Sequence, residues 1–223
     1  AACAAGIFSL EDGLRLIAAR GRLMQVLPED GGMLAVMASR ARVDALLSAE
    51  LLSRPVEIAA ENGPESTVIS GELEALTAAA EKLEADGMKT KQLQVSHAFH
   101  SRLMEPMLQA FEALARSVQY HPPEVAFISS VTGRTIEESF EAFDGDWARY
   151  WTQQIRRPVQ FATATQTLAK ETLAKENSVC FVELGPKPML LAMARECLSS
   201  VKANWLPSLV SAPSKLSSSK QGF

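Results

Sequence analysis

Apolar residues recur at the spacing of a helix in the first segment of the chain, residues 9–27. Ser9 is a candidate N-cap, and the acidic residues that follow it suit the positive end of a helix dipole. The apolar positions near helical spacing are Leu10, Leu14, Ile17, Leu23 and Met24. The pattern predicts a helix that ends before the PEDGG stretch at residues 28–32.

The next segment switches repeatedly between strand and helix patterns. Helical periodicity covers residues 39–52 and 72–87. The predicted strands cover residues 33–38, 56–62, 66–71 and 89–95. Asn62, Gly63 and Pro64 are expected to form the turn between the second and third strands. Strand, helix, strand, strand, helix, strand is the order of a ferredoxin-like α+β unit, so we expect a small subdomain over residues 33–95.

Longer apolar runs follow residue 96. Helical patterns cover residues 100–118, 147–155 and 158–176. VAFISSV (125–131) and CFVELG (180–185) have the continuous apolar character of strands buried on both faces of a parallel sheet. Such sheets usually contain more strands, so we expect the others upstream of Ala1. The sequence thus predicts an α/β fold whose large subdomain is discontinuous and incomplete, over residues 1–32 and 96–209.

The composition is that of an ordinary globular protein. The 223 residues are 47% hydrophobic and 22% charged with a formal net charge of −4, and no basic patch indicates a nucleic-acid partner. No apolar run approaches the ~20 residues of a membrane-spanning helix. Cys3, Cys180 and Cys197 are odd in number and far apart, which favours free thiols in a reducing cytoplasm over a disulfide framework or a zinc site. Residues 210–223, rich in Ser and Lys, are expected to be a linker or disordered tail.

Two of the three histidines, His97 and His100, stand close together in VSHAFHSRLMEP (95–106). A metal site would need a third ligand, and the nearest acid, Glu105, does not complete a known ligand motif. Each histidine could instead be a polar side chain that is satisfied where a strand leaves the small subdomain. Each could also be a general base, since imidazole titrates near neutral pH. The residues alone leave these two interpretations open.

Arg20 and the segment VELGPKPML (182–190) are two further candidates. Arg20 lies late in the first predicted helix, where the dipole favours a solvated cation, but its planar guanidinium also suits a carboxylate clamp. VELGPKPML follows a strand end, where α/β sheets bind ligands, although its Gly and Pro residues equally suit a turn. No G-x-S-x-G motif supplies a serine nucleophile. The residues alone therefore indicate a candidate base and a candidate anion clamp.

Several segments together resemble the acyltransferase domain of modular type I polyketide synthases, of the malonyl-CoA:acyl carrier protein transacylase family. In the order of that family they are AAGIFSLEDGLRLIAARGRLMQ, GGMLAVMA, AAENGPESTVISG, VSHAFHSRLMEPML, YWTQQIRRPVQFATA, FVELGPKPML and WLPSL. The resemblance implies a hydrolase-like α/β domain with a ferredoxin-like insert. It also implies malonyl-CoA and a phosphopantetheinyl acyl carrier protein as substrates and partners, no further cofactor, and neighbouring synthase domains such as a ketosynthase.

The resemblance assigns roles to individual residues. His100, the second histidine of HAFH, matches the base that activates a serine. Arg20 matches the arginine that holds the free carboxylate of a malonyl unit. Asn62 matches an asparagine that lines the site, and Gln160 in PVQF matches the position whose backbone carbonyl orients the catalytic imidazole.

The HAFH segment also bears on substrate choice. His97 and Phe99 resemble the malonyl-selective version of the family, whereas methylmalonyl-selective domains usually have Tyr-Ala-Ser-His there. Arg102 departs from the family, which usually has proline at this position. The serine nucleophile of the family is absent from the sequence, so we expect it upstream of Ala1 and expect the chain alone to be inactive. A free-standing transacylase of fatty-acid synthesis and a non-catalytic fragment that binds carrier protein are the alternatives.

Overall fold

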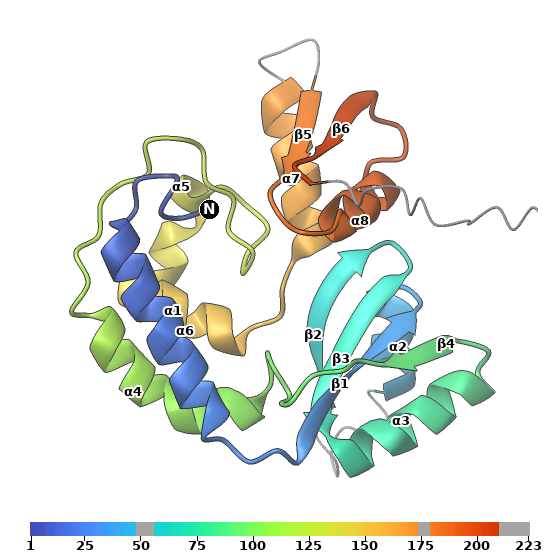
Figure 1. The fold of residues 1–223 in the computed structure, drawn as a ribbon. Helices are drawn as coiled ribbons and strands as arrows, with labels where there is room; N and C mark the ends of the chain where they lie inside the picture. Colours follow the sequence, from blue (N-terminus) through green and yellow to red (C-terminus); the bar gives the residue numbers. More distant parts are fainter. Residues whose placement is uncertain (48–55, 174–178, 210–223) are drawn as a thin grey trace, which may run out of the picture.

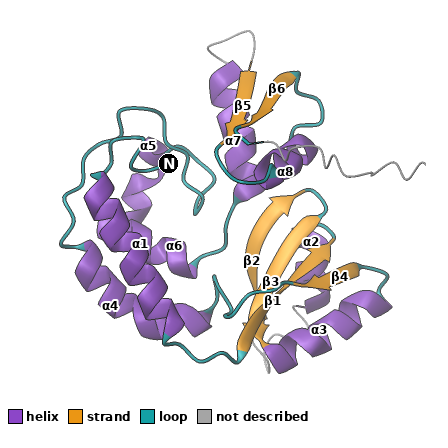
Figure 2. Ribbon diagram, viewed as in Figure 1, coloured by secondary structure: helices purple, strands orange, loops and turns teal. Residues whose placement is uncertain are grey.

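The computed structural model describes residues 1–47, 56–173 and 179–209. These residues form three groups of elements (Figure 1): a group of helices, a four-stranded sheet with two helices, and a two-stranded sheet with two helices. Figure 2 shows the strands confined to the second and third groups. The ends of the helices predicted over 39–52 and 158–176, and the whole tail 210–223, lie outside the described residues.

The helical group is built on α1 (Leu10–Gln25), α4 (Glu105–Ala115) and α6 (Trp147–Arg156), with the short turns η1 (Arg102–Met104), α5 (Ile136–Ser139) and η2 (Phe140–Phe143). Polar side chains set where the helices begin. The Ser9 hydroxyl accepts the Asp12 N–H at 3.0 Å, as predicted, and the Asp146 carboxylate accepts two N–H groups at the start of α6. Pro106 lies in the first turn of α4, where its missing N–H costs no helical hydrogen bond.

Only some of the apolar residues that give α1 its helical periodicity are packed in the core. Leu16 and Met24 pack in one core with residues of α4 and α6. Met24 belongs to the predicted periodic pattern, whereas Leu10, Leu14 and Ile17 of the same pattern are exposed. When apolar residues surround much of a helix, more than one of its faces shows helical periodicity. The neighbouring helices then decide which face is buried.

The sheet group follows the predicted order of elements. These are β1 (Gly31–Met37), α2 (Arg40–Leu47), β2 (Val56–Gly63), β3 (Ser66–Glu72), α3 (Leu73–Ala85) and β4 (Lys89–Gln92). The strands lie in the spatial order β2-β3-β1-β4, and each neighbouring pair is antiparallel. The hairpin turn falls on Pro64 and Glu65, later than predicted, because Asn62 and Gly63 still belong to β2.

The two faces of this sheet pack against different neighbours. Leu34 and Ile69 belong to an apolar core with residues of α2 and α3. Met33 and Ala60 belong to a second core, against which Phe99 packs. Because neighbouring residues of a strand point to opposite sides, β1 contributes to both cores. The second face of the sheet is therefore turned toward the segment that leads to α4.

The third group consists of α7 (Phe161–Leu173), β5 (Val179–Glu183), α8 (Met189–Cys197) and β6 (Ala203–Pro207). β5 and β6 are parallel, and Phe181 stacks on Trp205 with ring centroids 4.6 Å apart. The sequence predicts burial on both faces of β5, but Cys180 and Val182 are exposed. In the described part of the chain, helices α7 and α8 pack against one face of this small sheet, and the side chains of the opposite face remain open.

The prediction of a strand at residues 125–131 is wrong. The segment forms a loop that is closed by an isolated bridge between Ile128 and Thr135. The Gly133 N–H donates to the Ser129 carbonyl at 2.8 Å, and Gly133 adopts a φ of 73°, which glycine tolerates without a steric cost. Within the described residues the segment therefore bonds mainly within its own loop and pairs with no strand.

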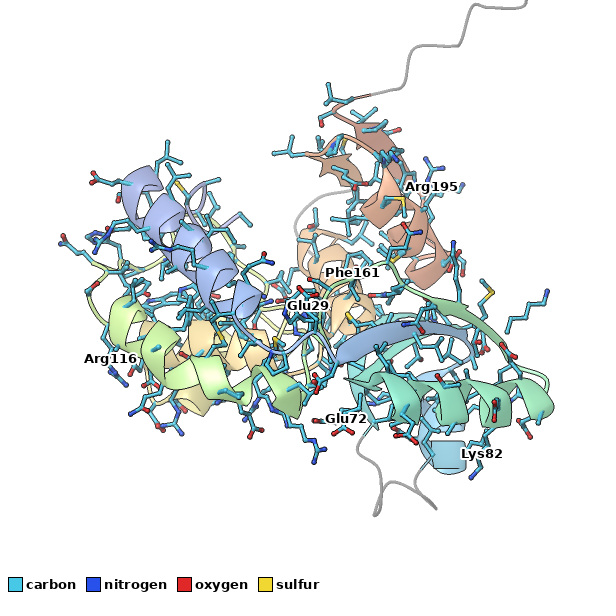
Figure 3. The ribbon with its side chains drawn as sticks, turned by 60° about the horizontal axis from the view of Figure 1, so that its bottom comes forward. Glu29, Glu72, Lys82, Arg116, Phe161 and Arg195 are labelled. Atoms are coloured by element: carbon cyan, nitrogen blue, oxygen red, sulfur yellow. The ribbon has the colours of Figure 1, made fainter. Side chains whose placement is uncertain are left out.

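The three groups meet around the segment that precedes α7. The Glu61 N–H donates to the Val159 carbonyl at 2.9 Å, and the Val159 N–H donates to the Ala59 carbonyl at 2.8 Å, so this segment runs alongside β2. Figure 3 shows Glu29 and Phe161 in the middle of the molecule, between the helical group and the sheet. Of the helices in the described ranges, none has the length and apolar character needed to cross a membrane.

Candidate functional site

His100 lies in a strained turn between the sheet group and α4. Its φ angle is 61°, in the left-handed region that residues with a side chain rarely adopt. The Phe99 N–H donates to the His97 carbonyl at 3.1 Å, and the Ser101 hydroxyl donates to the Ala98 carbonyl at 2.7 Å. These bonds hold the turn in place. Backbone strain of this kind clusters at functional sites.

The main chain fixes one ring nitrogen of His100. Nδ1 lies 2.9 Å from the carbonyl oxygen of Arg157, and because a carbonyl only accepts, Nδ1 carries the proton. The neutral ring then has its lone pair on Nε2, which is the form of a general base. Burial lowers the pKa of His100 below its ordinary value, and the nearby charge of Arg20 lowers it further, against the opposing effect of the Arg157 and Gln154 carbonyls. The imidazole is therefore neutral at neutral pH.

The prediction that Gln160 supplies this carbonyl is wrong. The carbonyl oxygen of Gln160 accepts the N–H of Ala164 in the first turn of α7, at 2.9 Å. The Gln160 N–H donates to the Ser130 carbonyl at 2.7 Å. Gln160 thus ties the start of α7 to the loop at 125–136, while Arg157 on the same segment holds His100.

Arg20 is near enough to His100 for its charge to lower the pKa of the imidazole, and its side chain is held by α6. Its guanidinium donates to the side-chain oxygen of Gln154. The main-chain carbonyl of Gln154 also interacts with His100, so this residue contacts both candidates. Burial lowers the pKa of Arg20, but a guanidinium stays charged at neutral pH. The site therefore combines a neutral imidazole with a fixed cation, an arrangement suited to chemistry next to an anionic group.

Arg20 also lines a cavity of about 120 Å³ between α1, α4 and α6. The other lining residues are Phe8, Gly13, Leu16, Ile17, Phe111 and Trp151. Apart from the guanidinium, the walls are apolar, and the indole N–H of Trp151 is buried without a hydrogen-bond partner in the described residues. These apolar surroundings account for the desolvation of Arg20.

His97 is a buried histidine whose ring nitrogens are both used. Its side chain is 2% exposed. Nε2 donates to the Leu27 carbonyl at 3.1 Å, so Nδ1 is unprotonated and accepts the Ser96 hydroxyl at 2.8 Å. Of the two interpretations that the sequence leaves open, the satisfied polar residue describes His97. It links the turn before α4 to the connection between α1 and β1.

Phe99 and Asn62 have different neighbours in the structure. The Phe99 ring packs both on the core of the helical group and on the second face of the sheet. Asn62 lies at the end of β2, where its carbonyl accepts the Cys197 thiol of α8 at 3.4 Å. No hydrogen bond in the described part of the chain joins Asn62 to the imidazole or the guanidinium. The structure thus brings His100 and Arg20 together and leaves Asn62 against α8.

Side-chain patterns do not reveal two of the residues that build this site. Arg157 acts through its carbonyl. Gln154 acts through its side-chain oxygen, which accepts a hydrogen bond from Arg20, and through its main-chain carbonyl, which raises the pKa of His100. Their position in the segment QQIRRPVQF is the one sequence feature that could have pointed to them. Across the described ranges, no group of three or more His, Cys, Asp or Glu side chains is arranged to hold a metal ion.

Comparisons with known sequences agree on one family. The family model described as acyl transferase domain matches residues 1–215. Polyketide synthase GfsA of Streptomyces halstedii is 42% identical over 203 residues, which are 91% of this chain and 3% of that protein. Mycoketide-CoA synthase of Mycobacterium tuberculosis is 43% identical over 209 residues, which are 94% of this chain and 5% of that protein.

Solved structures agree with this assignment. The acyltransferase domain from the second module of the salinomycin polyketide synthase is 43% identical with a TM-score of 0.82, and the match covers 93% of this chain and 46% of that chain. Malonyl CoA-acyl carrier protein transacylase from Clostridium perfringens is 27% identical with a TM-score of 0.81, covering 92% of this chain and 62% of that one. The chain spans a small part of the synthases that it matches and less than half of the salinomycin domain. Sequence and fold together show that this chain belongs to the acyl transferase domain family, with polyketide synthases as its curated relatives.

Proposed function

We propose that this chain is part of an acyltransferase that takes malonyl from malonyl-CoA and loads it onto the phosphopantetheine thiol of an acyl carrier protein in polyketide biosynthesis. The observation that carries the proposal is the pairing of the His100 imidazole, protonated on Nδ1, with the guanidinium of Arg20. Two relatives add support. The Clostridium protein is named a malonyl CoA-acyl carrier protein transacylase, and the SpnD acyl transferase domain, 26% identical, has a structure in complex with a substituted malonyl group.

The proposed reaction runs through a serine ester. A serine hydroxyl attacks the thioester carbonyl of malonyl-CoA while Nε2 of His100 takes its proton, and the protonated ring then gives that proton to the departing CoA thiolate. In the second half-reaction Nε2 takes the proton of the phosphopantetheine thiol, whose sulfur attacks the ester. The protonated ring returns the proton to the leaving serine. The product is a malonyl thioester of the carrier protein and a regenerated serine.

The serine that this mechanism needs is proposed to lie in the parent protein, upstream of Ala1. The motif that would carry it is absent from the sequence. The match covers 46% of the 43% identical salinomycin domain, which leaves room for such a segment in the parent protein. On this proposal residues 1–223 by themselves transfer no acyl group.

Arg20 is proposed to hold the free carboxylate of the malonyl group. Arginine binds a carboxylate through two parallel N–H donors, which fixes its direction as well as its charge. In the structure the guanidinium donates to Gln154, so a substrate carboxylate would displace or share that bond. A carboxylate held in this way also discriminates against uncharged acyl groups, because they offer the partly buried cation no opposite charge.

The remaining expectations concern the pocket, the fold and the partners. Phe99 is proposed to line the acyl pocket. The same expectation for His97 and Asn62 has no support among the described contacts, since His97 is buried with both ring nitrogens bonded and Asn62 bonds to Cys197 of α8. The domain is proposed to be hydrolase-like, with the sheet group inserted as a ferredoxin-like subdomain; the antiparallel strand order β2-β3-β1-β4 supports this. An acyl carrier protein and adjacent synthase domains such as a ketosynthase are the proposed partners, in the cytoplasm.

The test is a transfer assay on the acyltransferase of the full parent protein, with labelled malonyl-CoA and carrier protein. Wild type should label the carrier protein, and His100→Ala should lose at least about a hundredfold in rate, the usual share of a general base. His121→Ala is the matched control, since His121 is exposed and should be silent. Undiminished transfer by His100→Ala would refute the assignment of His100 as the general base. A wild-type protein that binds carrier protein without labelling it would instead favour a non-catalytic role.

A further inference from the structure

The carboxylate of Glu57 on β2 bonds to both sides of the His100 turn. Its Oε1 accepts the backbone N–H of Arg102 at 2.8 Å, and its Oε2 lies 2.7 Å from Nη1 of Arg156. Arg102 lies just after His100. Arg156 immediately precedes Arg157, whose carbonyl holds Nδ1 of His100. One side chain thus joins the segment that carries the base to the segment that orients it.

The carboxylate of Glu57 forms two strong interactions, a hydrogen bond with the Arg102 N–H and an ion pair with Arg156. Both are charge-assisted, and a carboxylate can accept them at once through its two oxygens. The side chains of Glu57 and Arg156 are 29% and 25% exposed, so solvent screens this pair less than a pair on the open surface. Arg156 is held on its other edge by Glu105, whose Oε1 accepts the Nε–H at 2.9 Å.

The hydrogen bond from the Arg102 N–H to Glu57 lies next to the strained backbone of His100 and helps to hold it. His100 has a left-handed backbone, and the turn needs anchors on both sides to keep it. Before His100, the anchors are bonds within the turn itself. After it, the N–H of Arg102 opens η1 and has no carbonyl partner inside that helix. Glu57 satisfies this N–H from a different element and so ties the turn to β2.

We propose that Glu57 is a positioning residue for His100. Its carboxylate clamps the Arg102 N–H and the Arg156 guanidinium, so that the imidazole keeps its bond to the Arg157 carbonyl and presents Nε2 in one orientation. The inference deepens the proposed function, because it takes His100 as the base of acyl transfer. The clamp itself is a structural arrangement and can be measured without catalysis.

The kinetic test compares two variants of Glu57 with a matched control, in the acyltransferase of the full parent protein. Glu57→Ala should lower kcat by about tenfold to a hundredfold, as expected when a catalytic group is misplaced by about 1 Å, with little change in KM for malonyl-CoA. Glu57→Gln retains an acceptor for the Arg102 N–H, so its kcat should fall less than that of Glu57→Ala. Glu112→Ala is the matched control, because it removes a carboxylate that pairs with Arg116 within α4 and contacts neither Arg102 nor Arg156, and it should keep the wild-type kcat.

The spectroscopic test reads the tautomer of His100 from the ¹⁵N shifts of its ring. Wild type and the control Glu112→Ala should show the Nδ1–H tautomer at neutral pH. Glu57→Ala should show a mixture with the Nε2–H tautomer and faster exchange of the Nδ1 proton. If Glu57→Ala does not fold, the tautomer of His100 is measured in Glu57→Gln instead. A smaller shift toward the Nε2–H tautomer in that variant would support the positioning role of Glu57.

Two results separate this inference from the proposed function. A wild-type tautomer and a wild-type kcat in both folded Glu57 variants would overturn the positioning role and leave acyl transfer intact. A wild-type protein with no transfer activity would overturn the proposed function. The ring shifts of the Glu57 variants, compared with those of Glu112→Ala, would still show whether the clamp holds His100.

Discussion

The carbonyl oxygen of Arg157 lies 2.9 Å from Nδ1 of His100, across 57 positions of sequence. This carbonyl is turned out of a helix. Arg157 is the C-cap of α6 with φ −82° and ψ 156°, and it precedes Pro158, which disfavours a helical backbone in the residue before it. The proline that ends α6 therefore directs the carbonyl toward the imidazole.

The first prediction concerns the dependence of acyl transfer on pH. A general base works in its neutral form, so the rate falls as pH drops through its pKa. Burial and the charge of Arg20 both lower the pKa of His100, so the acid limb of kcat/KM should lie below pH 6.5. A pH–rate profile with a thioester substrate measures this limb. A limb above pH 6.5 would contradict the neutral, partly buried imidazole.

The second prediction concerns Arg20. Arg20→Gln removes a positive charge that lowers the pKa of His100, so the acid limb should move to higher pH. The same change removes the proposed carboxylate clamp and should shift the preference from malonyl-CoA toward acetyl-CoA. Arg22→Gln, an exposed position in the same helix, is the control and should change neither property. A surviving malonyl preference in Arg20→Gln would refute the clamp.

The third prediction concerns the stability that His97 provides. His97→Ala removes a fully buried ring and leaves the Leu27 carbonyl without its donor, so the free energy of unfolding should fall by about 2–3 kcal/mol. Urea denaturation measures this loss. His121→Ala, at an exposed histidine, should change it by less than about 0.5 kcal/mol. Equal, small effects of the two substitutions would show that the bonds of His97 contribute little.

The fourth prediction compares two glycines with left-handed backbones. Gly87 has a φ of 78° and open space around it, so Gly87→Ala should cost only the backbone strain, about 1–2 kcal/mol. Gly133 has a φ of 73°, and a Cβ there would stand 2.6 Å from the Cβ of Thr163. Gly133→Ala should therefore cost about 1–3 kcal/mol more than Gly87→Ala. Denaturation curves of both variants would measure the difference, which should vanish if Thr163 moves aside freely.

Much of the local structure could be predicted because its causes lie within a few residues. Ser9 caps α1, and Gly87 takes the left-handed backbone that ends α3. The alternation of strand and helix patterns predicts the element order of the sheet group. The strand expected at 125–131 fails for the complementary reason: an apolar run becomes a strand only when another strand pairs with it, and here the loop bonds to itself.

The same distinction between local and long-range causes applies to the candidate site. The sequence by itself determined which side chains have suitable chemistry, His100 and Arg20, since imidazole and guanidinium are properties of the residues. Only the tertiary structure decided that they share one site, that His97 is a buried structural residue, and that the carbonyl of Arg157 rather than that of Gln160 orients the base. The physical reason is that every residue carries a carbonyl, and which one meets a distant imidazole depends on how whole helices end and pack.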